Sequence, residues 1–318
     1  MQSTNLTVSN SPHIGSETKI NTIMLDVVLA LMPNAVAGTV FFGCRALFLM
    51  AVCVVSCVLF EFLWRKITRQ PVTTGDLSAV VTGLLFSMTL PVTMPFWIAV
   101  TGSFFAIIIV KQFFGGLGKN FVNPALAARA FVLTSWPLHM ERWVSPFNKN
   151  VLDAMSAATP LAAQRAGEQI PAYWNLFVGN VPGCIGETSV LAILIGLAYL
   201  LFRRVISARV PLVYIGTVAI LAYAFGGRSL GGGDALFHVL SGGLMLGAVF
   251  MAADYTTTPI TPKGQIIFAL GCGVLTVVIR LCGGHPEGVT YAVLIMNIAA
   301  PLIDQLVRLK RYGRREEQ

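Results

Sequence analysis

Apolar residues form about ten separate runs along the chain, and glycine, proline or charged residues divide each run from the next. The runs cover residues 24–42, 44–63, 76–92, 94–114, 120–136, 188–203, 210–226, 234–253, 262–281 and 286–305. A membrane-spanning helix needs roughly 20 apolar residues, and several of these runs are shorter. The clearest short runs, 76–92 and 120–136, have prolines such as Pro91, Pro95 and Pro124 in or beside them. The pattern therefore predicts about ten membrane helices, some of them short or discontinuous.

The composition is that of a membrane protein. Of the 318 residues, 55% are hydrophobic and 11% are charged, whereas a soluble domain carries about 25% charged residues. So few charges cannot cover a water-facing surface, which excludes a soluble enzyme, a disordered chain and a collagen-like chain. We expect an all-α polytopic membrane protein.

The distribution of lysine and arginine predicts the orientation of the helices. Fifteen of these residues lie at one set of segment ends and six at the opposite set, while Arg129 lies inside a segment. Positive residues concentrate on the cytoplasmic side of membrane proteins. The fifteen, among them Lys111 and the cluster at 308–315, are therefore expected in the cytoplasm together with both termini. The long polar insertion at 137–187 is then extracytoplasmic, and the net charge of +8 needs no nucleic-acid partner.

The two halves of the chain are loosely similar. The segment 81–95 resembles 240–259, and Lys111 precedes a glycine pair much as Arg280 does. Five helices in each half is an odd number, so the second repeat would be inverted relative to the first, as in many transporters. Frequent glycine and proline in membrane helices can imitate so weak a similarity. The expected domains are a cytoplasmic tail (1–22), a first transmembrane repeat (23–136), an extracytoplasmic loop (137–187), a second repeat (188–306) and a basic cytoplasmic tail (307–318).

Within the polar insertion, Thr159 and Pro160 have the sequence of a helix start, because threonine is favoured at the N-cap and proline at the first helical position. A helix start also offers free backbone N–H groups to a phosphate. The neighbours Ala154, Ala157 and Ala158 have little bulk and leave access to the threonine hydroxyl. Two interpretations, a plain cap and a phosphate-bearing threonine, are open at this point.

The residues before Thr159 follow the pattern Asp153-x-x-Ser156-x-Ala158-Thr159, which resembles the motif at which a flavin transferase joins FMN to threonine through a phosphoester. Other characteristic stretches are GKNFVNPALAARAF (118–131), GCIGETS (183–189), FMAADYTTTPITPKG (250–264) and GGHPEGVTYAVLIMNIAAPLID (283–304). Over nearly its whole length the chain is similar to the D-subunit family of the Rnf complex, the ion-translocating ferredoxin:NAD⁺ oxidoreductase. That family is related to the B-subunit family of the sodium-pumping NADH:quinone reductase.

The resemblance implies specific cofactors and partners. Thr159 would bear covalent FMN, and Asp153, Ser156 and Ala158 would belong to the recognition sequence of the transferase, although two alanines stand where many members have glycine. A second flavin, noncovalent riboflavin, is also implied, with ligands that the sequence does not identify. The partners would be the iron–sulfur and FMN subunits of the complex, a second subunit with covalent FMN and the flavin transferase. Ferredoxin and NAD would act indirectly, and the location would be the bacterial cytoplasmic membrane.

The six cysteines contain no Cys-x-x-Cys pair. Iron–sulfur clusters and structural zinc sites usually draw on such clustered cysteines. We therefore expect no metal site on this chain alone, in keeping with iron–sulfur clusters that belong to other subunits.

Ionisable residues within or beside apolar segments are candidates for an ion or flavin path, because a charge in lipid is costly. Arg129 and Asp254 are the first candidates, and Asn123 and Thr256 can supply polar contacts to an ion or a flavin. Structural pairing or packing explains these residues equally well. Glu61 lies near a segment end, from which its carboxylate can reach the interface. Arg129 and Asp254 are both expected to lie away from the flavin-bearing loop.

Three functions fit this fold, because a fold alone does not determine function. The resemblance favours a membrane flavoprotein subunit that relays electrons through FMN, coupled to transport of Na⁺ or H⁺, and that is not catalytic in isolation. The alternatives are a small-solute secondary transporter or channel with inverted repeats and no redox role, and a scaffold without a cofactor. Flavin attached to Thr159 is the feature that separates the first function from the other two.

Overall fold

The computed structural model describes residues 20–71, 73–147, 157–227, 231–283 and 287–307. All regular elements in these ranges are helices, and no strand occurs among them. The longer helices are α1 (Ile20–Phe42), α2 (Cys44–Ile67), α10 (Arg209–Phe225), α13 (Pro262–Cys282) and α14 (Val289–Leu306). The shorter elements are η1 (Thr74–Asp76), α3 (Ser78–Met88), α4 (Phe96–Phe104), η2 (Phe105–Gln112), α5 (Pro124–Ser135), α6 (Pro137–Met140), α7 (Pro160–Ala166), α8 (Tyr173–Val178), α9 (Val190–Phe202), α11 (Ala235–Leu240), α12 (Leu244–Leu246) and η3 (Gly247–Met251).

Four of these helices, α1, α2, α13 and α14, are long and apolar enough to cross a membrane. The helices α3, α9 and α10 are apolar but shorter, as is the continuous stretch of α4 and η2. The expected all-helical fold is thus confirmed for the described residues, and each predicted segment contains helix. The two segments that we expected to be short contain α3 and α5, which have 11 and 12 residues.

The segment 234–253 differs from the expected single span, because it is broken into α11, α12 and η3. Gly242, between α11 and α12, has a φ of +67°, which only glycine adopts without strain. A Cβ atom at this position would also lie 2.8 Å from Leu161 Cδ1, so the Leu161 side chain of α7 would have to move to make room for it. Gly242 and Gly243 look like ordinary membrane-helix composition in the sequence, but they interrupt the helix.

Helix α1 is continuous although it contains Asp26 and Asn34, which interrupt its hydrophobic sequence. The carboxylate of Asp26 accepts hydrogen bonds from the Tyr199 hydroxyl at 2.9 Å and from Arg203 Nε at 3.2 Å. Asn34 Nδ2 donates to the carbonyl of Gly186 at 2.7 Å. Because a buried polar group is tolerated when it is hydrogen-bonded, these partners from the second half of the chain stabilise the helix.

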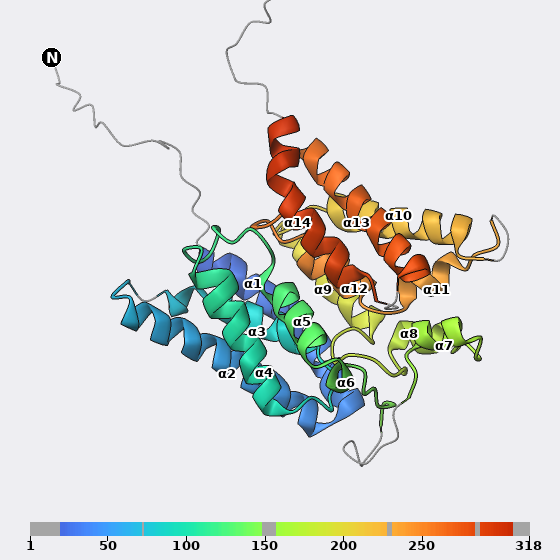
Figure 1. Cartoon of the computed structure of the whole chain (residues 1–318), viewed down its shortest axis with the longest axis horizontal. Coiled ribbons are helices and arrows are strands. Elements are labelled where there is room, and N and C mark those ends of the chain that lie inside the picture. The colour runs from blue at the N-terminus through green and yellow to red at the C-terminus, as the bar shows by residue number, and fades with distance from the viewer. Residues whose placement is uncertain (1–19, 72, 148–156, 228–230, 284–286, 308–318) are drawn as a thin grey trace, which may run out of the picture.

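The helices form two groups that meet along two pairs of helices. In Figure 1 the blue-to-green helices α1–α6 form one group, and the yellow-to-red helices α9–α14 form the other. Within the first group α2 packs on α3 and α4, and within the second α10 packs on α13. Contacts between the groups join α1 to α9 and α5 to α14. The first and last apolar segments of each half therefore lie at the junction.

The outward faces of the long helices carry large apolar side chains. Val40, Phe48, Val55, Ile220 and Val278 are each at least half exposed. A soluble monomer rarely exposes contiguous apolar surface of this kind. The surface thus agrees with the composition and with a protein whose helices contact lipid.

Helices α7 and α8 belong to the polar insertion, and side-chain contacts join them to the rest of the molecule. The Tyr173 hydroxyl at the start of α8 donates to Asp234 Oδ2 at 2.5 Å, ahead of α11. This hydrogen bond to a carboxylate raises the pKa of Tyr173. Helix α7 begins as predicted: Thr159 is its N-cap and accepts a hydrogen bond from the N–H of Ala162 at 3.3 Å.

Candidate functional site

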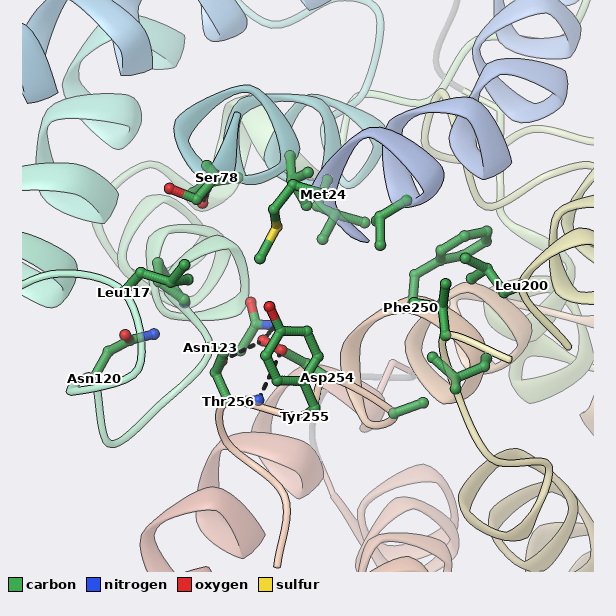
Figure 2. Close-up of a pocket in the computed structure, with 18 of the residues that line it drawn as sticks. Met24, Ser78, Leu117, Asn120, Asn123, Leu200, Phe250, Asp254, Tyr255 and Thr256 are labelled. Carbon is green, nitrogen blue, oxygen red and sulfur yellow. Dashed lines mark hydrogen bonds between the residues drawn. The ribbon is translucent and has the colours of Figure 1, made fainter. Parts of the chain in front are cut away.

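The polar residues predicted in the first and second halves meet at a cavity near the start of α5. Asn123 is the N-cap of α5, and its side-chain oxygen accepts hydrogen bonds from the N–H groups of Ala125 and Leu126. That arrangement directs its Nδ2 atom towards Asp254, 3.4 Å from Oδ2. Figure 2 shows both side chains at the same cavity, beside Thr256. Three of the four candidate ion- or flavin-path residues are therefore neighbours.

The backbone after η3 folds around the carboxylate of Asp254. Its Oδ1 accepts the N–H of Thr256 at 3.0 Å, and its Oδ2 accepts the hydroxyl of the same residue at 2.9 Å. Thr258 donates its hydroxyl to the Asp254 carbonyl. Burial raises the pKa of Asp254 above its usual range, against the two hydrogen bonds from Thr256 that lower it. The site thus holds a carboxyl group that binds a proton more readily than one in water.

The cavity beside Asp254 is small, with a volume of about 70 Å³. Asn120 also lines it, and the Asn120 Oδ1 atom is buried without a hydrogen-bond partner. A typical small-molecule pocket has about 300 Å³ or more. In this conformation the cavity has room for a few waters or a small ion, and a flavin fits only after the lining rearranges.

A buried ion pair borders the same cavity, and the sequence analysis did not predict it. Lys111 Nζ lies 2.8 Å from Glu61 Oε2, and both side chains are at most 2% exposed. The ammonium group also donates to Ser78 Oγ at 2.6 Å, and Thr73 donates its hydroxyl to the other oxygen of Glu61. Lys111 and Glu61 therefore neutralise each other in the interior, whereas the charge count treated Lys111 as a charge at a segment end. No spacing rule could pair two residues that lie 50 positions apart.

Arg129, the remaining path candidate, lies near a second cavity and forms two ion pairs. Its Nη1 atom contacts Glu187, and its Nη2 atom contacts Glu287. The Arg129 and Glu187 side chains are nearly fully buried, and Glu287 is 18% exposed. The expectation that Arg129 lies away from the polar insertion is wrong, because Glu187 belongs to that insertion. The sequence indicated that Arg129 is a charge within an apolar segment. It did not indicate its partners, because Glu187 and Glu287 lie in distant loops.

The second cavity has a volume of about 370 Å³ and contains Thr159 at its wall. Arg129, Ala158 and Ala162 line the same cavity, together with Trp143. Thr159 itself is 5% exposed. Asp153 and Ser156, the other motif residues, lie outside the described residues. The structure therefore brings Arg129 to Thr159 and Ala158, whereas the sequence analysis assigned Arg129 to a separate ion or flavin path.

The Thr159 cavity has the volume of a small-molecule pocket and contains a guanidinium group that can contact a phosphate. Its volume lies within the range of small-molecule pockets, about 300–1,000 Å³. Arg129 supplies a buried cation whose Nε atom has no hydrogen-bond partner, and guanidinium groups recognise phosphate well. Glu187 and Glu287 pair with this cation, and Glu141 also lines the cavity, so acidic groups outnumber the guanidinium group. Small side chains at Ala158 and Ala162 leave room around the threonine.

These observations define an all-helical membrane protein with a cavity at a threonine cap and a separate cavity, between its two helical groups, that contains Asn123 and Asp254. The family model described as "NQR2, RnfD, RnfE family" matches residues 7–313 of the chain. The chain belongs to this family.

Characterised relatives match over nearly the full length. The chain is 51% identical to the D subunit of the Na⁺-translocating ferredoxin:NAD⁺ oxidoreductase complex of Acetobacterium woodii, covering 98% of this chain and 97% of that protein. It is 43% identical to the D subunit of the proton-translocating ferredoxin:NAD⁺ oxidoreductase complex of Clostridium ljungdahlii, covering 97% and 96% of the two chains. It is also 39% identical to the D subunit of the ion-translocating oxidoreductase complex of Stutzerimonas stutzeri, covering 93% and 92%.

Proposed function

We propose that the chain is the D subunit of an ion-translocating ferredoxin:NAD⁺ oxidoreductase complex and carries FMN on Thr159 through a phosphoester. The observation that carries this proposal is the cavity of about 370 Å³ that Thr159 shares with Arg129 and Trp143. Full-length similarity to the D subunits of such complexes supports it. A flavin bound there supplies electron transfer in steps of one or two electrons.

The residues of the cavity have distinct roles in this proposal. Thr159 supplies the attachment oxygen, and Arg129 provides a cation that is held in place by Glu187 and Glu287. Ala158 and Ala162 leave space at the attachment point. Asp153 and Ser156 serve as recognition residues for the flavin transferase before attachment. The role of the protein is to hold the phosphate group of the flavin in place and to exclude water from the isoalloxazine ring.

We also propose that the chain has two inverted five-helix repeats in the bacterial cytoplasmic membrane, with both termini in the cytoplasm. The repeats are residues 23–136 and 188–306, and the flavin-bearing loop at 137–187 lies outside. The packing of α1 on α9 and of α5 on α14 supports this arrangement, because equivalent helices of two symmetric halves meet at the junction. The distribution of lysine and arginine supports the orientation.

The Asn123–Asp254 cavity is the proposed site on an ion or second-flavin path. It lies between the repeats, where transporters with repeated halves place their substrates. Asp254 offers a partly buried carboxylate, while Asn123 and Thr256 offer polar groups beside it. The partners of the chain in this scheme are the iron–sulfur and FMN subunits of the complex, including a second subunit with covalent FMN, with ferredoxin and NAD at the ends of the electron path.

The experiment that tests the FMN proposal is an intact-mass measurement of the chain purified within its complex. We expect one covalent FMN on the wild type and none on Thr159→Val, which is nearly isosteric but lacks the attachment oxygen. The loss of the N-cap costs about 1 kcal/mol, too little to unfold a chain of this size. Thr159→Ser retains both the cap and a hydroxyl and tests whether the transferase accepts a primary alcohol.

Thr101→Val is the matched control, because Thr101 is outside both cavities and donates only to the Trp97 carbonyl. Its flavin content should equal that of the wild type. If Thr159→Val still carries one covalent FMN, the flavin is attached to another residue. A wild type without flavin, purified from its native host, would refute the redox role and return the secondary-transporter function to consideration.

A further inference from the structure

A third cavity lies beside α7 and shares no lining residue with the Thr159 cavity. It is an open cavity with a volume of about 200 Å³, lined by residues of α7, α11 and the end of α13. Gln164 and Arg165 from α7, His238 from α11 and Arg280 from α13 contribute its polar lining. Leu161, Gln164 and Arg165 are spaced so that they share one face of the helix. The proposed function makes no use of these side chains.

Arg280 is a buried cation without a carboxylate partner among the described residues. Its side chain is 4% exposed. The Nη1 atom donates to the carbonyl of His238 at 2.5 Å and the Nη2 atom to the carbonyl of Ser241 at 3.0 Å, while the Nε atom is buried without a partner. Lys111, which precedes the equivalent glycine pair in the first half, has the carboxylate of Glu61. Burying a charge without a paired carboxylate is costly, and the carboxylate of Glu287, which pairs with Arg129, acts on Arg280 only from beyond ion-pair distance.

Two further groups of the cavity add to its preference for an anion. His238 is 4% exposed, and its Nε2 atom is buried without a hydrogen-bond partner. Arg165 lies at the mouth and contacts the Arg280 carbonyl, which brings a second guanidinium group to the same cavity. The nearby carboxylate of Asp234 is engaged by the Phe237 N–H and the Tyr173 hydroxyl. The lining thus contains two arginines and an imidazole, and no carboxylate lies among the lining residues that the structure describes.

We propose that this cavity binds a phosphate-type oxyanion. Arginine guanidinium groups match phosphate oxygens in geometry and charge, and such charge-assisted hydrogen bonds are the stronger ones in proteins. The anion supplies the negative charge that Arg280 lacks. It also joins α7 to α11 and α13, and so fixes the helix that follows Thr159. The site does not depend on flavin at Thr159.

The same chemistry is offered by free phosphate and by the headgroup of an anionic phospholipid. Leu281 lines the cavity and continues an exposed apolar strip along α13 that includes Leu270, Val274 and Val278. These positions follow helical spacing on one face. An acyl chain on that strip would place its phosphodiester at the cavity mouth, so the experiment needs separate arms for the lipid and the free anion.

The experiment uses the delipidated complex in neutral detergent. One arm titrates phosphatidylglycerol and measures, with native mass spectrometry, the lipid that the chain retains. The other arm measures binding of radiolabelled inorganic phosphate by equilibrium dialysis. The test variant is Arg165→Gln, because Arg165 is exposed and the glutamine amide can still donate to the Arg280 carbonyl. Arg142→Gln is the matched control, because it removes the same charge from the same insertion outside this cavity.

We expect affinity for at least one probe in the wild type and in Arg142→Gln, and a loss of about tenfold or more in Arg165→Gln, since hydrogen bonds to charged groups are strong. His238→Asn is the second variant and should also weaken binding. Phosphatidylglycerol retained without competition from phosphate would identify the lipid as the ligand, and binding of phosphate that displaces the lipid would identify the free anion. Equal affinity in Arg165→Gln, His238→Asn and the control, or no affinity for either probe, overturns the proposal.

Discussion

Asn123 Nδ2 lies 3.4 Å from Asp254 Oδ2, although 131 residues separate the two positions. Asn123 caps α5 in the first half of the chain, and Asp254 follows η3 in the second half. The contact therefore crosses the junction between the two helical groups. A shift of one group against the other would change this polar cavity before it changed the packing of either group.

Asp254→Asn tests whether that contact has a function. Burial raises the pKa of Asp254, so holding the group ionised costs stability in the folded protein at neutral pH, and the amide removes this cost. We expect an unchanged or higher melting temperature of the complex together with an approximately tenfold loss of coupled ion transport, equivalent to about 1.4 kcal/mol. Differential scanning fluorimetry and ion uptake by proteoliposomes measure the two effects. If Asp254→Asn transports ions at the wild-type rate, or if its transport falls only in proportion to a lower melting temperature, Asp254 has a packing role.

Arg129→Ala should affect the proposed flavin site, contrary to the expectation from sequence. Arg129 shares a cavity with Thr159, and its removal leaves Glu187 buried without a cation. Such unpaired buried charges cost about 3–5 kcal/mol. We expect lower covalent FMN content by mass and a lower melting temperature. The variant Arg129→Ala/Glu187→Gln should recover most of the melting temperature but not the FMN, and full recovery of both would make Arg129 a structural residue only.

The Glu61–Lys111 pair should show strong energetic coupling. Glu61→Gln leaves Lys111 charged and buried, and Lys111→Met leaves Glu61 in the same condition, so each single variant should be destabilised by about 3–5 kcal/mol. The double variant should be more stable than the sum of the two predicts, with an interaction energy of about 1–3 kcal/mol. Denaturation of the detergent-solubilised protein measures all four species. Additive effects would show that the ammonium group depends mainly on Ser78.

Cysteine labelling tests the proposed orientation. The exposed residues Cys44 and Cys282 are first replaced by serine. Single cysteines at Glu168 and Tyr173 in the insertion should then react with a membrane-impermeant maleimide in intact cells, because the positive residues assign that side to the exterior. A cysteine at Gln318 should react only after permeabilisation. The reverse pattern would invert the topology and place the proposed flavin in the cytoplasm.

Hydropathy located the helices well, because a span must be apolar whatever it packs against. It failed at 234–253, where the break depends on the positive φ of Gly242 and on the approach of Leu161. The cap at Thr159 was predictable because capping is local. The pairing of Lys111 with Glu61 was not, since ion pairs between helices depend on tertiary packing. The shared cavity of Arg129 and Thr159 was missed for the same reason.

The polar contacts of α1 have a consequence for how the protein is made. Asp26 and Asn34 are translated well before their partners, because Gly186 follows Asn34 by 152 residues and Arg203 follows Asp26 by 177 residues. A charged group within a membrane helix is costly when it has no partner. Helix α1 therefore reaches its final hydrogen bonds only after α9 and Arg203 have been translated. The final packing of α1 therefore depends on helices that are synthesised much later and lie beside it in the folded protein.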